Sequence, residues 1–421
     1  MPAKRPLTPA GNIVQFYNCK VLRNHELVED YLYIQDGRII DPRHMFWGKQ
    51  VTPDITIDCE GCIISPGYID VQLNGAFGYD FTSDSDCAAK AADVISKGLL
   101  LQGVTSYCPT LVSSEADVYE KVVPHLGPRK GDIHNGAEIL GAHLEGPFIS
   151  PQKKGAHEVT TFTSAPKGLS DFTDRYGLKN LKEKVAYITV APEVEGIMDS
   201  IEQIKRETGI KVSVGHSMAT VSQAEEACRR GCTLITHLFN AQPTFHQRDP
   251  GVVGMLGSSE HRPYYGIICD GIHVHPNSIK IAYNAHPKGA ILVTDAMAAQ
   301  GLPDGAYKLG QLDVEVTNGK VVLTGTDTIA GSVATMDECV RNFVKFTGAS
   351  KVEALENATL HPAEALGIAD RKGTLNFGAD ADFLLLDDDL NVKRVFIDGE
   401  EVKPEELKFT PRTHQSVPET P

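Results

Sequence analysis

The stretch KVSVGHSMATVSQAEEACRRGCTLITHL, residues 211–238, contains one complete strand–helix–strand unit. Residues 211–215 and 233–238 are short apolar runs of the length that buried strands have. Between them, residues 220–223 (TVSQ) form a capping box that begins a helix, and Gly231 ends that helix directly before the second run. A strand, a helix and a strand at this spacing indicate a parallel sheet with helical crossovers.

The same rhythm continues on both sides of this unit. Short apolar runs alternate with helical stretches through the middle of the chain, at residues 63–73, 104–112, 139–144, 185–190, 211–215, 233–238, 264–269 and 290–294. Eight is the number of strands that a closed parallel barrel requires. We therefore predict an α/β fold with a (β/α)8 barrel of the TIM type.

The two ends of the chain have a different pattern, that of β hairpins. Near the N-terminus Asp36-Gly37 separates two apolar runs, and near the C-terminus Asp398-Gly399 follows two others. An Asp-Gly pair between such runs favours a tight hairpin turn. The runs concerned are residues 31–34 and 38–40, and residues 383–386 and 395–397.

These patterns predict a domain organisation. The barrel is expected over residues 63–372. Residues 1–62 and 373–405 are expected to build one small β-sandwich domain together, because both ends are rich in β-type runs. Residues 406–421 are polar and contain prolines, so we expect a loose tail there.

The composition excludes several classes of protein. Of the 421 residues, 41% are hydrophobic and 23% are charged, which is typical of a soluble globular protein. The formal net charge of −15 argues against a nucleic-acid surface, because phosphate backbones require a basic stripe. No apolar run approaches the roughly 18 residues that span a bilayer, so we expect no membrane partner. The nine scattered cysteines favour reduced thiols and a cytoplasmic location.

Residues that a purely structural barrel does not need stand after most of the predicted strands. They are Gln72 and Asn74, Glu145, His216, His237, Asp270 and His273, and Asp295. In barrels of this kind the active site is built at the C-terminal ends of the strands. A single histidine is usually a packed or surface residue, but two histidines and a carboxylate at the ends of three strands indicate a shared site.

Glu145, His216 and His237 form the ligand set that we predict. Two imidazole nitrogens and one carboxylate oxygen leave an open position for water, as in a catalytic site for zinc or a similar divalent ion. Asp295 would then be free to take a proton from that water. His143 shares a strand face with Glu145, two residues away, and we expect it to be a packed, hydrogen-bonded histidine.

Seven short motifs, in order along the chain, carry a family resemblance. They are residues 72–75 (QLNG), 143–147 (HLEGP), 153–157 (KKGAH), 215–217 (GHS), 236–241 (THLFNA), 270–273 (DGIH) and 293–296 (VTDA). Together they resemble the N-acetylglucosamine-6-phosphate deacetylases of the amidohydrolase superfamily. The resemblance extends from about residue 61 to residue 378.

The resemblance implies roles for the residues that match these motifs. Glu145, His216 and His237 would bind the metal, and Asp295 would act as general base and then as general acid. His157 would hydrogen-bond the acetyl carbonyl and help to stabilise the oxyanion.

The same resemblance implies a set of substrate contacts. His273 would contact the sugar, while the backbone at Asn240-Ala241 and the side chain of Arg248 would hold the 6-phosphate. Residues 329–332 (IAGS) resemble the loop that lines the acetyl pocket. Further contacts to the substrate are expected from Ala156, Ile329, Gln72 and Asn74.

The chain departs from the family pattern in two places. The first-strand His-x-His of the superfamily is replaced by Gln72 and Asn74, which lack two good ligands for a second metal. One divalent ion per chain is therefore expected, with Zn²⁺ as the expected ion. The phosphate loop has Asp249 after Arg248, where relatives often have glutamate.

The resemblance predicts hydrolysis of the acetamide of N-acetyl-D-glucosamine 6-phosphate to glucosamine 6-phosphate and acetate, in amino-sugar catabolism. It also implies a homodimer. One alternative is another amidohydrolase that acts on a different N-acyl or cyclic amide. Such enzymes often keep His-x-His on strand one and a carboxylated lysine on strand four, and residues 185–190 contain no lysine. A non-catalytic barrel scaffold is the other alternative, but scaffolds typically lose their metal ligands.

Overall fold

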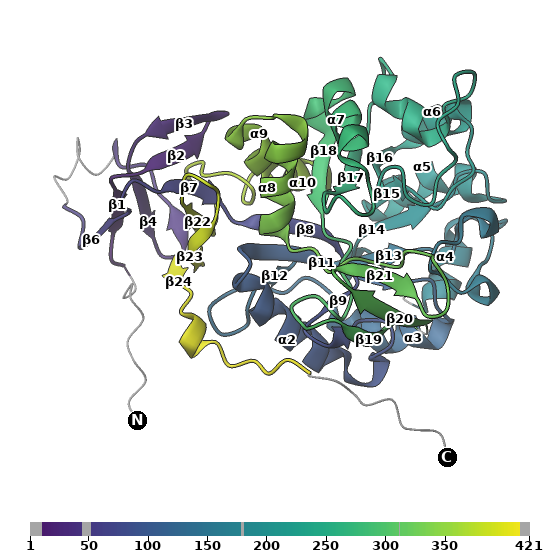
Figure 1. Ribbon diagram of the computed structural model, residues 1–421, viewed down its shortest axis with the longest axis horizontal. Helices are drawn as coiled ribbons and strands as arrows, with labels where there is room; N and C mark the ends of the chain where they lie inside the picture. The colour runs from purple at the N-terminus through teal and green to yellow at the C-terminus, as the bar shows by residue number, and fades with distance from the viewer. Residues whose placement is uncertain (1–10, 44–51, 178–180, 311, 413–421) are drawn as a thin grey trace.

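The computed structural model describes residues 11–43, 52–177, 181–310 and 312–412. Among them, eight parallel strands form a barrel, which lies beside the sheets formed by the chain ends (Figure 1). Each strand pairs in parallel with the next one in the series, which confirms the predicted barrel. The strands in order are β8 (Tyr68–Leu73), β11 (Val104–Val112), β13 (Ala142–Glu145), β14 (Val185–Val190), β15 (Lys211–Val214), β16 (Cys232–Ile235), β17 (Tyr264–Ile268) and β18 (Ala290–Val293).

The barrel closes between β18 and β8, at the C-terminal ends of both strands. The Asp295 N–H donates to the Gln72 carbonyl at 2.9 Å, and the Asn74 N–H donates to the Ala296 carbonyl at 2.8 Å. A parallel bridge between Leu73 and Ala296 lies beside these bonds. The seam therefore brings the polar residues after the first and the last strand together.

Helices cover the outside of the barrel, and their ends have the predicted capping residues. Thr220 and Gln223 form a capping box at the start of α6, which ends at Gly231, and Thr335 and Glu338 form another at the start of α8. None of the helices in the described part of the chain is long and apolar enough to cross a membrane. The helices are α2 (Ala88–Leu100), α3 (Ala116–Val122), α4 (Leu169–Tyr176), α5 (Ile197–Thr208), α6 (Val221–Arg230), α7 (Pro276–Ala285), α8 (Met336–Thr347), α9 (Lys351–Glu356) and α10 (Leu360–Leu366).

The helix α10 packs at the N-terminal end of the barrel. Its Ala363 and Ala365 belong to one buried cluster with barrel residues such as Ile69 and Ile291. The backbone N–H of Ile69 also donates to the Ala358 carbonyl, at 2.8 Å, directly before this helix. The site must therefore be reached from the opposite, C-terminal end.

Two sheets at one end of the molecule combine the two ends of the chain, and Figure 1 shows the purple N-terminal strands beside the yellow C-terminal ones. The six-stranded sheet has the order β24 (Glu400–Glu401), β23 (Val392–Ile397), β22 (Phe383–Leu386), β7 (Ile63–Pro66), β2 (Lys20–Arg23), β3 (Glu26–Glu29). The four-stranded sheet has the order β5 (Arg38–Ile39), β4 (Leu32–Gln35), β1 (Val14–Tyr17), β6 (Ile55–Asp58).

A shared apolar core packs between these two sheets. Phe16 of β1 contacts Phe383 and Phe396 of the other sheet, with ring centroids 5.0 and 5.1 Å apart. All three rings are buried in one cluster. The predicted β sandwich from both chain ends is confirmed, and both predicted Asp-Gly turns lie between paired strands, β4–β5 and β23–β24.

The first predicted strand, residues 63–73, is wrong as a single element. The chain passes from β7 in the six-stranded sheet to β8 in the barrel at Gly67. The Gly67 N–H donates to the Asp382 carbonyl, and the next N–H, that of Tyr68, donates to the Gly103 carbonyl. A Cβ atom at residue 67 would lie 2.1 Å from the Thr105 hydroxyl oxygen, so the close crossing requires glycine. The barrel therefore begins at Tyr68 rather than at residue 63.

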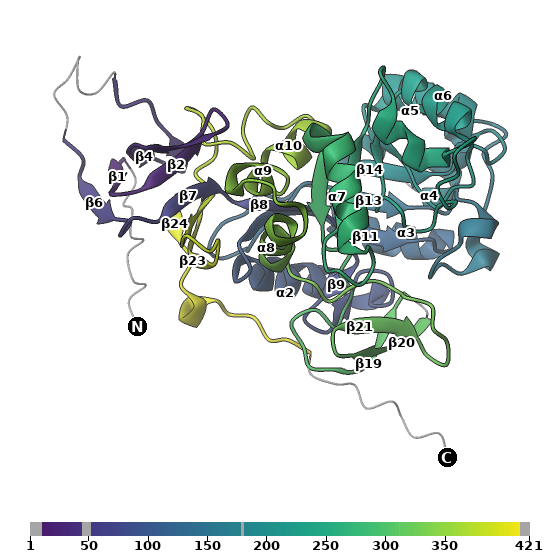
Figure 2. The same ribbon diagram turned by 45° about the horizontal axis from the view of Figure 1, so that its top comes forward.

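A small antiparallel sheet between β18 and α8 was not predicted. Its strands are β19 (Gly305–Leu309), β20 (Leu312–Thr317) and β21 (Lys320–Leu323). Figure 2 shows this sheet standing outside the barrel ring, on a different side from the end sheets. The alternating burial of β20 is the period-two pattern of a half-buried strand, so a sequence signal was present.

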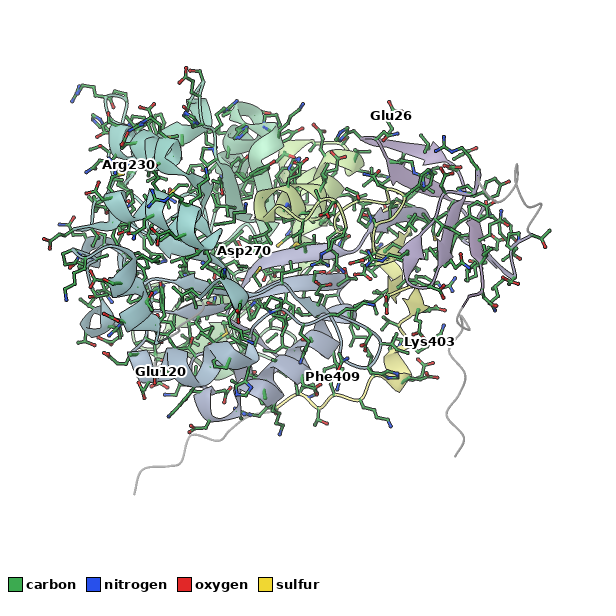
Figure 3. The ribbon with its side chains drawn as sticks, turned by 180° about the vertical axis from the view of Figure 1, so that it is seen from behind. Glu26, Glu120, Arg230, Asp270, Lys403 and Phe409 are labelled. Atoms are coloured by element: carbon green, nitrogen blue, oxygen red, sulfur yellow. The ribbon has the colours of Figure 1, made fainter. Side chains whose placement is uncertain are left out.

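The chain does not form a loose tail directly after residue 406. Leu407 and Phe409 pack against the main core, and Figure 3 shows Phe409 beside the first barrel helices. The Arg412 N–H donates to the Phe77 carbonyl at 2.9 Å, and its guanidinium donates to Asp84 at 2.6 Å. Residues 407–412 are thus held against the barrel domain by the apolar side chains of Leu407 and Phe409 and by the ion pair of Arg412. Residues 413–421 lie outside the described residues.

Candidate metal centre and catalytic pocket

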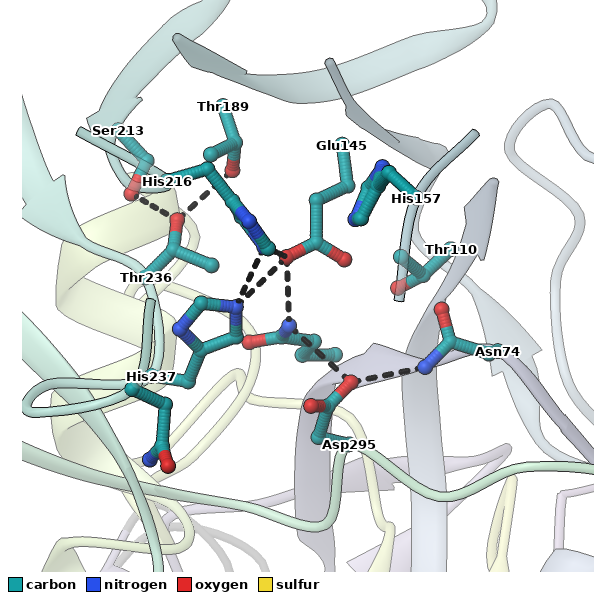
Figure 4. Close-up of polar contacts among 12 residues, drawn as sticks. Asn74, Thr110, Glu145, His157, Thr189, Ser213, His216, Thr236, His237 and Asp295 are labelled. Atoms are coloured by element: carbon teal, nitrogen blue, oxygen red, sulfur yellow. Dashed lines mark hydrogen bonds and ion pairs between the residues drawn. The ribbon is translucent and has the colours of Figure 1, made fainter. Parts of the chain in front are cut away.

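The side chains of Glu145, His216 and His237 meet at the C-terminal mouth of the barrel (Figure 4). The Glu145 Oε1 atom lies 3.1 Å from His216 Nε2 and 2.9 Å from His237 Nε2, and these two nitrogens are 3.0 Å apart. All three residues are buried. The three predicted ligand residues therefore converge on one point, with one donor atom each.

The backbone at the ends of three strands turns sharply to point side chains at this centre. His216, His237 and Asp295 have positive φ values of 48°, 29° and 47°. Non-glycine residues rarely adopt this left-handed conformation, because Cβ then crowds the backbone. Such strain is stored preferentially at functional sites, where the surrounding fold imposes it.

The ring of His216 is oriented by the loop that carries residues 153–157. Its Nδ1 atom donates to the Lys153 carbonyl, 2.8 Å away, which leaves Nε2 facing Glu145. Gly155 lies directly against the ring, because a Cβ atom there would come within 3.0 Å of His216 Cε1. A carbonyl behind a metal-binding imidazole fixes the tautomer that presents a lone pair to the ion.

The charges at the centre favour a cation. Burial disfavours charge on every group there, yet the contacts of Glu145 with the imidazoles of His216 and His237 hold its pKa well below its usual value. Burial likewise lowers the pKa of His237, but the Glu145 carboxylate raises it to about 9. The carboxylate thus attracts positive charge, either a proton on an imidazole or a divalent ion that displaces this proton.

Asp295 faces the centre and is held by two amides. Asn74 Nδ2 donates to Asp295 Oδ1 at 2.8 Å (Figure 4). Gln72 Nε2 donates to the same oxygen at 3.2 Å. Gln72 Nε2 also lies 3.2 Å from Glu145 Oε1. Burial, with a smaller contribution from Glu145, raises the pKa of Asp295 to about 6. The two amides, predicted as substrate contacts, therefore also orient the carboxylates, and of the two only Asn74 lines the pocket.

His157 is buried beside the ligands and hydrogen-bonds to Ser113. Its Nδ1 atom accepts from the Ser113 N–H at 3.2 Å and lies 2.8 Å from the Ser113 hydroxyl oxygen. Burial holds the pKa of His157 well below its usual value, so the ring is neutral. A neutral imidazole that accepts at Nδ1 carries its proton at Nε2 and can donate there.

The remaining predicted substrate contacts fall into two groups. His273 is oriented by Asp270, whose carboxylate lies 2.7 Å from its Nδ1, and it lines the pocket. Arg248 is exposed and does not line the pocket. The described residues around the pocket include these predicted ones: Asn74, Glu145, Ala156, His157, His216, His237, Asn240, Ala241, His273, Asp295 and Ile329.

His143 is a packed histidine, as predicted. Its Nδ1 and Nε2 atoms lie 3.0 Å from the Thr110 hydroxyl and 2.7 Å from the Thr189 hydroxyl. Its ring stacks on Tyr187 with centroids 3.9 Å apart. Burial lowers its pKa to about 3, so the ring supports the floor of the site as a neutral group.

Three residues at the site were missed in the sequence. Val112 ends β11 and Ser113 directly follows it, so the rule that singles out residues at strand ends could have identified both. Leu309 lines the pocket from β19, in the sheet that was not predicted. A second carboxylate cluster, at Glu138, Asp380 and Asp382, surrounds the Lys372 ammonium, 2.8 Å from Glu138, which fills the place of an ion.

Comparisons with known proteins agree with this arrangement. Residues 63–402 match the model of the amidohydrolase family. An N-acetylglucosamine-6-phosphate deacetylase from Danio rerio is 48% identical over 409 residues, which are 96% of this chain and 99% of the relative.

Solved structures of similar proteins extend the comparison. A deacetylase of the same name from Pasteurella multocida has a TM-score of 0.81 at 30% identity, over 92% of this chain and 99% of the other. A mutant of the N-acetyl-D-glucosamine-6-phosphate deacetylase from Mycobacterium smegmatis has been solved in complex with N-acetyl-D-glucosamine-6-phosphate. It has a TM-score of 0.78 at 31% identity, over 94% of this chain and 100% of the other.

Proposed function

The chain belongs to the N-acetylglucosamine-6-phosphate deacetylases of the amidohydrolase family, and from this we propose that it hydrolyses the acetamide of N-acetyl-D-glucosamine 6-phosphate to glucosamine 6-phosphate and acetate. The observation that supports this chemistry most directly is the convergence of Glu145, His216 and His237 on one buried point. The proposed role in the cell is amino-sugar catabolism and control of the hexosamine pool.

The three converging side chains fit one divalent cation, and we propose Zn²⁺. Two imidazole nitrogens and one carboxylate oxygen are a donor set typical of catalytic zinc. When bound, the ion would lower the pKa of water and polarise the amide carbonyl. Gln72 and Asn74 donate hydrogen bonds through amide nitrogens, which are not metal ligands, and this supports a single ion.

Different residues around the ion would carry out the separate steps of amide hydrolysis. Asp295, held by Asn74, would take a proton from the attacking water and pass it to the leaving nitrogen, because an amide anion is too basic to leave. His157 would donate from Nε2 to the carbonyl oxygen as negative charge develops there.

The sugar phosphate would occupy the polar side of the pocket. His273 would contact the sugar, and its hydrogen bond to Asp270 holds the ring toward the pocket. The backbone at Asn240 and Ala241, which also line the pocket, would contact the 6-phosphate.

We also propose a homodimer in which Arg248 reaches the phosphate of the other chain's substrate. Arg248 and Phe245, which is 62% exposed, lie on the same loop after β16. An exposed aromatic ring beside an arginine is typical of an interface. A cytoplasmic location is part of the same proposal, supported by nine free cysteines.

The test is acetate release by purified protein from N-acetylglucosamine with and without a 6-phosphate, and from the C4 epimer N-acetylgalactosamine 6-phosphate. We expect N-acetylglucosamine 6-phosphate to have the highest kcat/KM of the three substrates. An equal rate without the phosphate would contradict the proposed substrate, and no acetate from any of the three would favour a different amidohydrolase reaction.

A further inference from the structure

A second cavity adjoins the catalytic pocket. It measures about 300 Å³ and lies over the C-terminal end of β11, between the loops after β11 and β13 and the β19–β20 hairpin. Three residues line both spaces, and they are Val112, Ala156 and Leu309. These three side chains form a partition between the pocket and the second cavity.

Packing and hydrogen bonds hold the partition in place. Leu309 is 3% exposed and packs in a cluster with Met297 and Ala330. The next residue, Gly310, donates its N–H to the buried Asp80 carboxylate at 3.3 Å. A Cβ atom at Gly310 would lie 3.0 Å from Val112 Cγ2, so Gly310 rests directly on β11.

The partition lies where the acyl group of the substrate should lie. His157, the proposed donor to the acyl carbonyl, is bonded to Ser113 and follows Ala156 in the chain. If the acyl carbonyl oxygen of the substrate accepts a hydrogen bond from His157, the acyl carbon lies close to Ala156 and to Val112. The polar residues His273 and Asn240 line the pocket as well and suit the sugar phosphate, so the apolar partition suits the methyl group.

We propose that Leu309, with Val112, determines acyl-chain specificity by closing the pocket behind an acetyl group. This inference rests on the proposed deacetylase function. Behind the partition, Val118 and Leu312 add apolar surface to the second cavity. A shortened side chain at position 309 would join the two spaces and admit longer N-acyl groups of hexosamine 6-phosphates.

The experiment compares kcat/KM for the N-acetyl, N-propionyl and N-butyryl derivatives of glucosamine 6-phosphate, measured by release of the primary amine. One methylene in an apolar pocket typically changes kcat/KM by about 10–200-fold. We expect the wild type to lose at least about tenfold per added methylene. Leu309→Ala should reduce the loss for the N-butyryl substrate by at least about tenfold.

Two further variants make the result decisive. Leu312→Ala enlarges only the second cavity, which Leu312 lines without lining the pocket, and it should keep the wild-type preference. Val112→Ala opens the same partition from β11, and it should shift the preference as Leu309→Ala does, even if Leu309→Ala does not fold.

Three results would overturn the inference. The first is a wild type that accepts N-butyryl as well as N-acetyl, and the second is an unchanged preference in both folded partition variants. The third is a shift of equal size in Leu312→Ala. If the wild type is inactive toward all three derivatives, the proposed function itself fails, and this inference fails with it.

Discussion

The Nδ1 atom of His157 accepts a hydrogen bond from the backbone N–H of Ser113, 3.2 Å away. This contact places the proton of the neutral ring on Nε2, the nitrogen left for the pocket. A backbone N–H cannot be removed by a side-chain substitution, so the ring orientation should survive changes at position 113. The proposed oxyanion donor is therefore set by the end of β11.

Replacing His157 by Ala should lower kcat by about 10²–10³, the range for loss of one preorganised oxyanion donor. The metal content should not change, because His157 is not a proposed ligand. Ser113→Ala keeps the backbone donor and serves as the matched control, with a loss below about tenfold. A His157→Ala enzyme within a few-fold of the wild-type kcat would contradict the assignment.

Purified protein should contain about one catalytic divalent ion per chain, because a site of this type has three protein ligands and Gln72 and Asn74 provide no second set. His216→Ala and His237→Ala should each lose the ion and nearly all turnover, while His125→Ala, at an exposed position away from the site, should keep both. Elemental analysis of the three variants is the measurement. Full metal content in both ligand variants would show that the ligands are wrong.

Asp295 should set the acid limb of the pH–rate profile. Burial raises its pKa to about 6, and a bound cation nearby would lower it. The carboxylate form is the base, so kcat/KM should be constant above that pKa and fall as the pH decreases through it, at or below pH 6. Asp295→Asn should retain the metal and lose about 10²–10⁴ in rate. A limb that persists unchanged in Asp295→Asn would assign it to another group.

Arg248 should act on phosphorylated substrate only. Arg248→Ala should weaken kcat/KM for the 6-phosphate by about 1.5–3 kcal/mol, the scale of hydrogen bonds to charged groups, and leave the unphosphorylated sugar unaffected. Equal losses on both substrates would indicate a structural role instead.

A mixing experiment checks whether Arg248 acts across the dimer. Arg248→Ala and Asp295→Asn chains, refolded together, should regain activity, because the mixed dimer has one site with an intact Asp295 and its partner's arginine. No gain, with mixed dimers demonstrated by mass, would place Arg248 in its own chain's site.

Lys372 should be essential for stability, away from the site. Its side chain is 5% exposed, and its ammonium lies 2.8 Å from Glu138 and 3.0 Å from Asp380, joining the barrel to the end sheets. Arg371 still pairs with Glu138 and Asp380, but Lys372→Met leaves the buried Asp382 carboxylate without its cation. The substitution should therefore lower the free energy of unfolding by about 3–5 kcal/mol, measured with urea. The control Lys351→Met breaks only an exposed pair with Asp388 and should change it by less than about 1 kcal/mol. Similar small changes in both variants would contradict the prediction.

Local sequence pattern determined the barrel, its seven motifs and the residues that meet at the metal centre. Apolar runs of strand length specify a strand, and helical crossovers make these strands parallel, so residues such as Glu145, His216 and His237 share one end of the barrel. Their meeting follows from strand order alone. The two Asp-Gly turns could also be predicted from the sequence, because the residue preferences of a tight turn are local.

Tertiary structure alone decided how distant segments complete the site. The chain leaves the end sheet for the barrel at Gly67 because Thr105, far along the sequence, approaches too closely for a side chain. Leu309 becomes a wall of the pocket because Gly310 rests on Val112, a contact that no local periodicity encodes. The docking of Arg412 on Asp84 is of the same kind, since an ion pair between residues so far apart depends on the fold that brings them together.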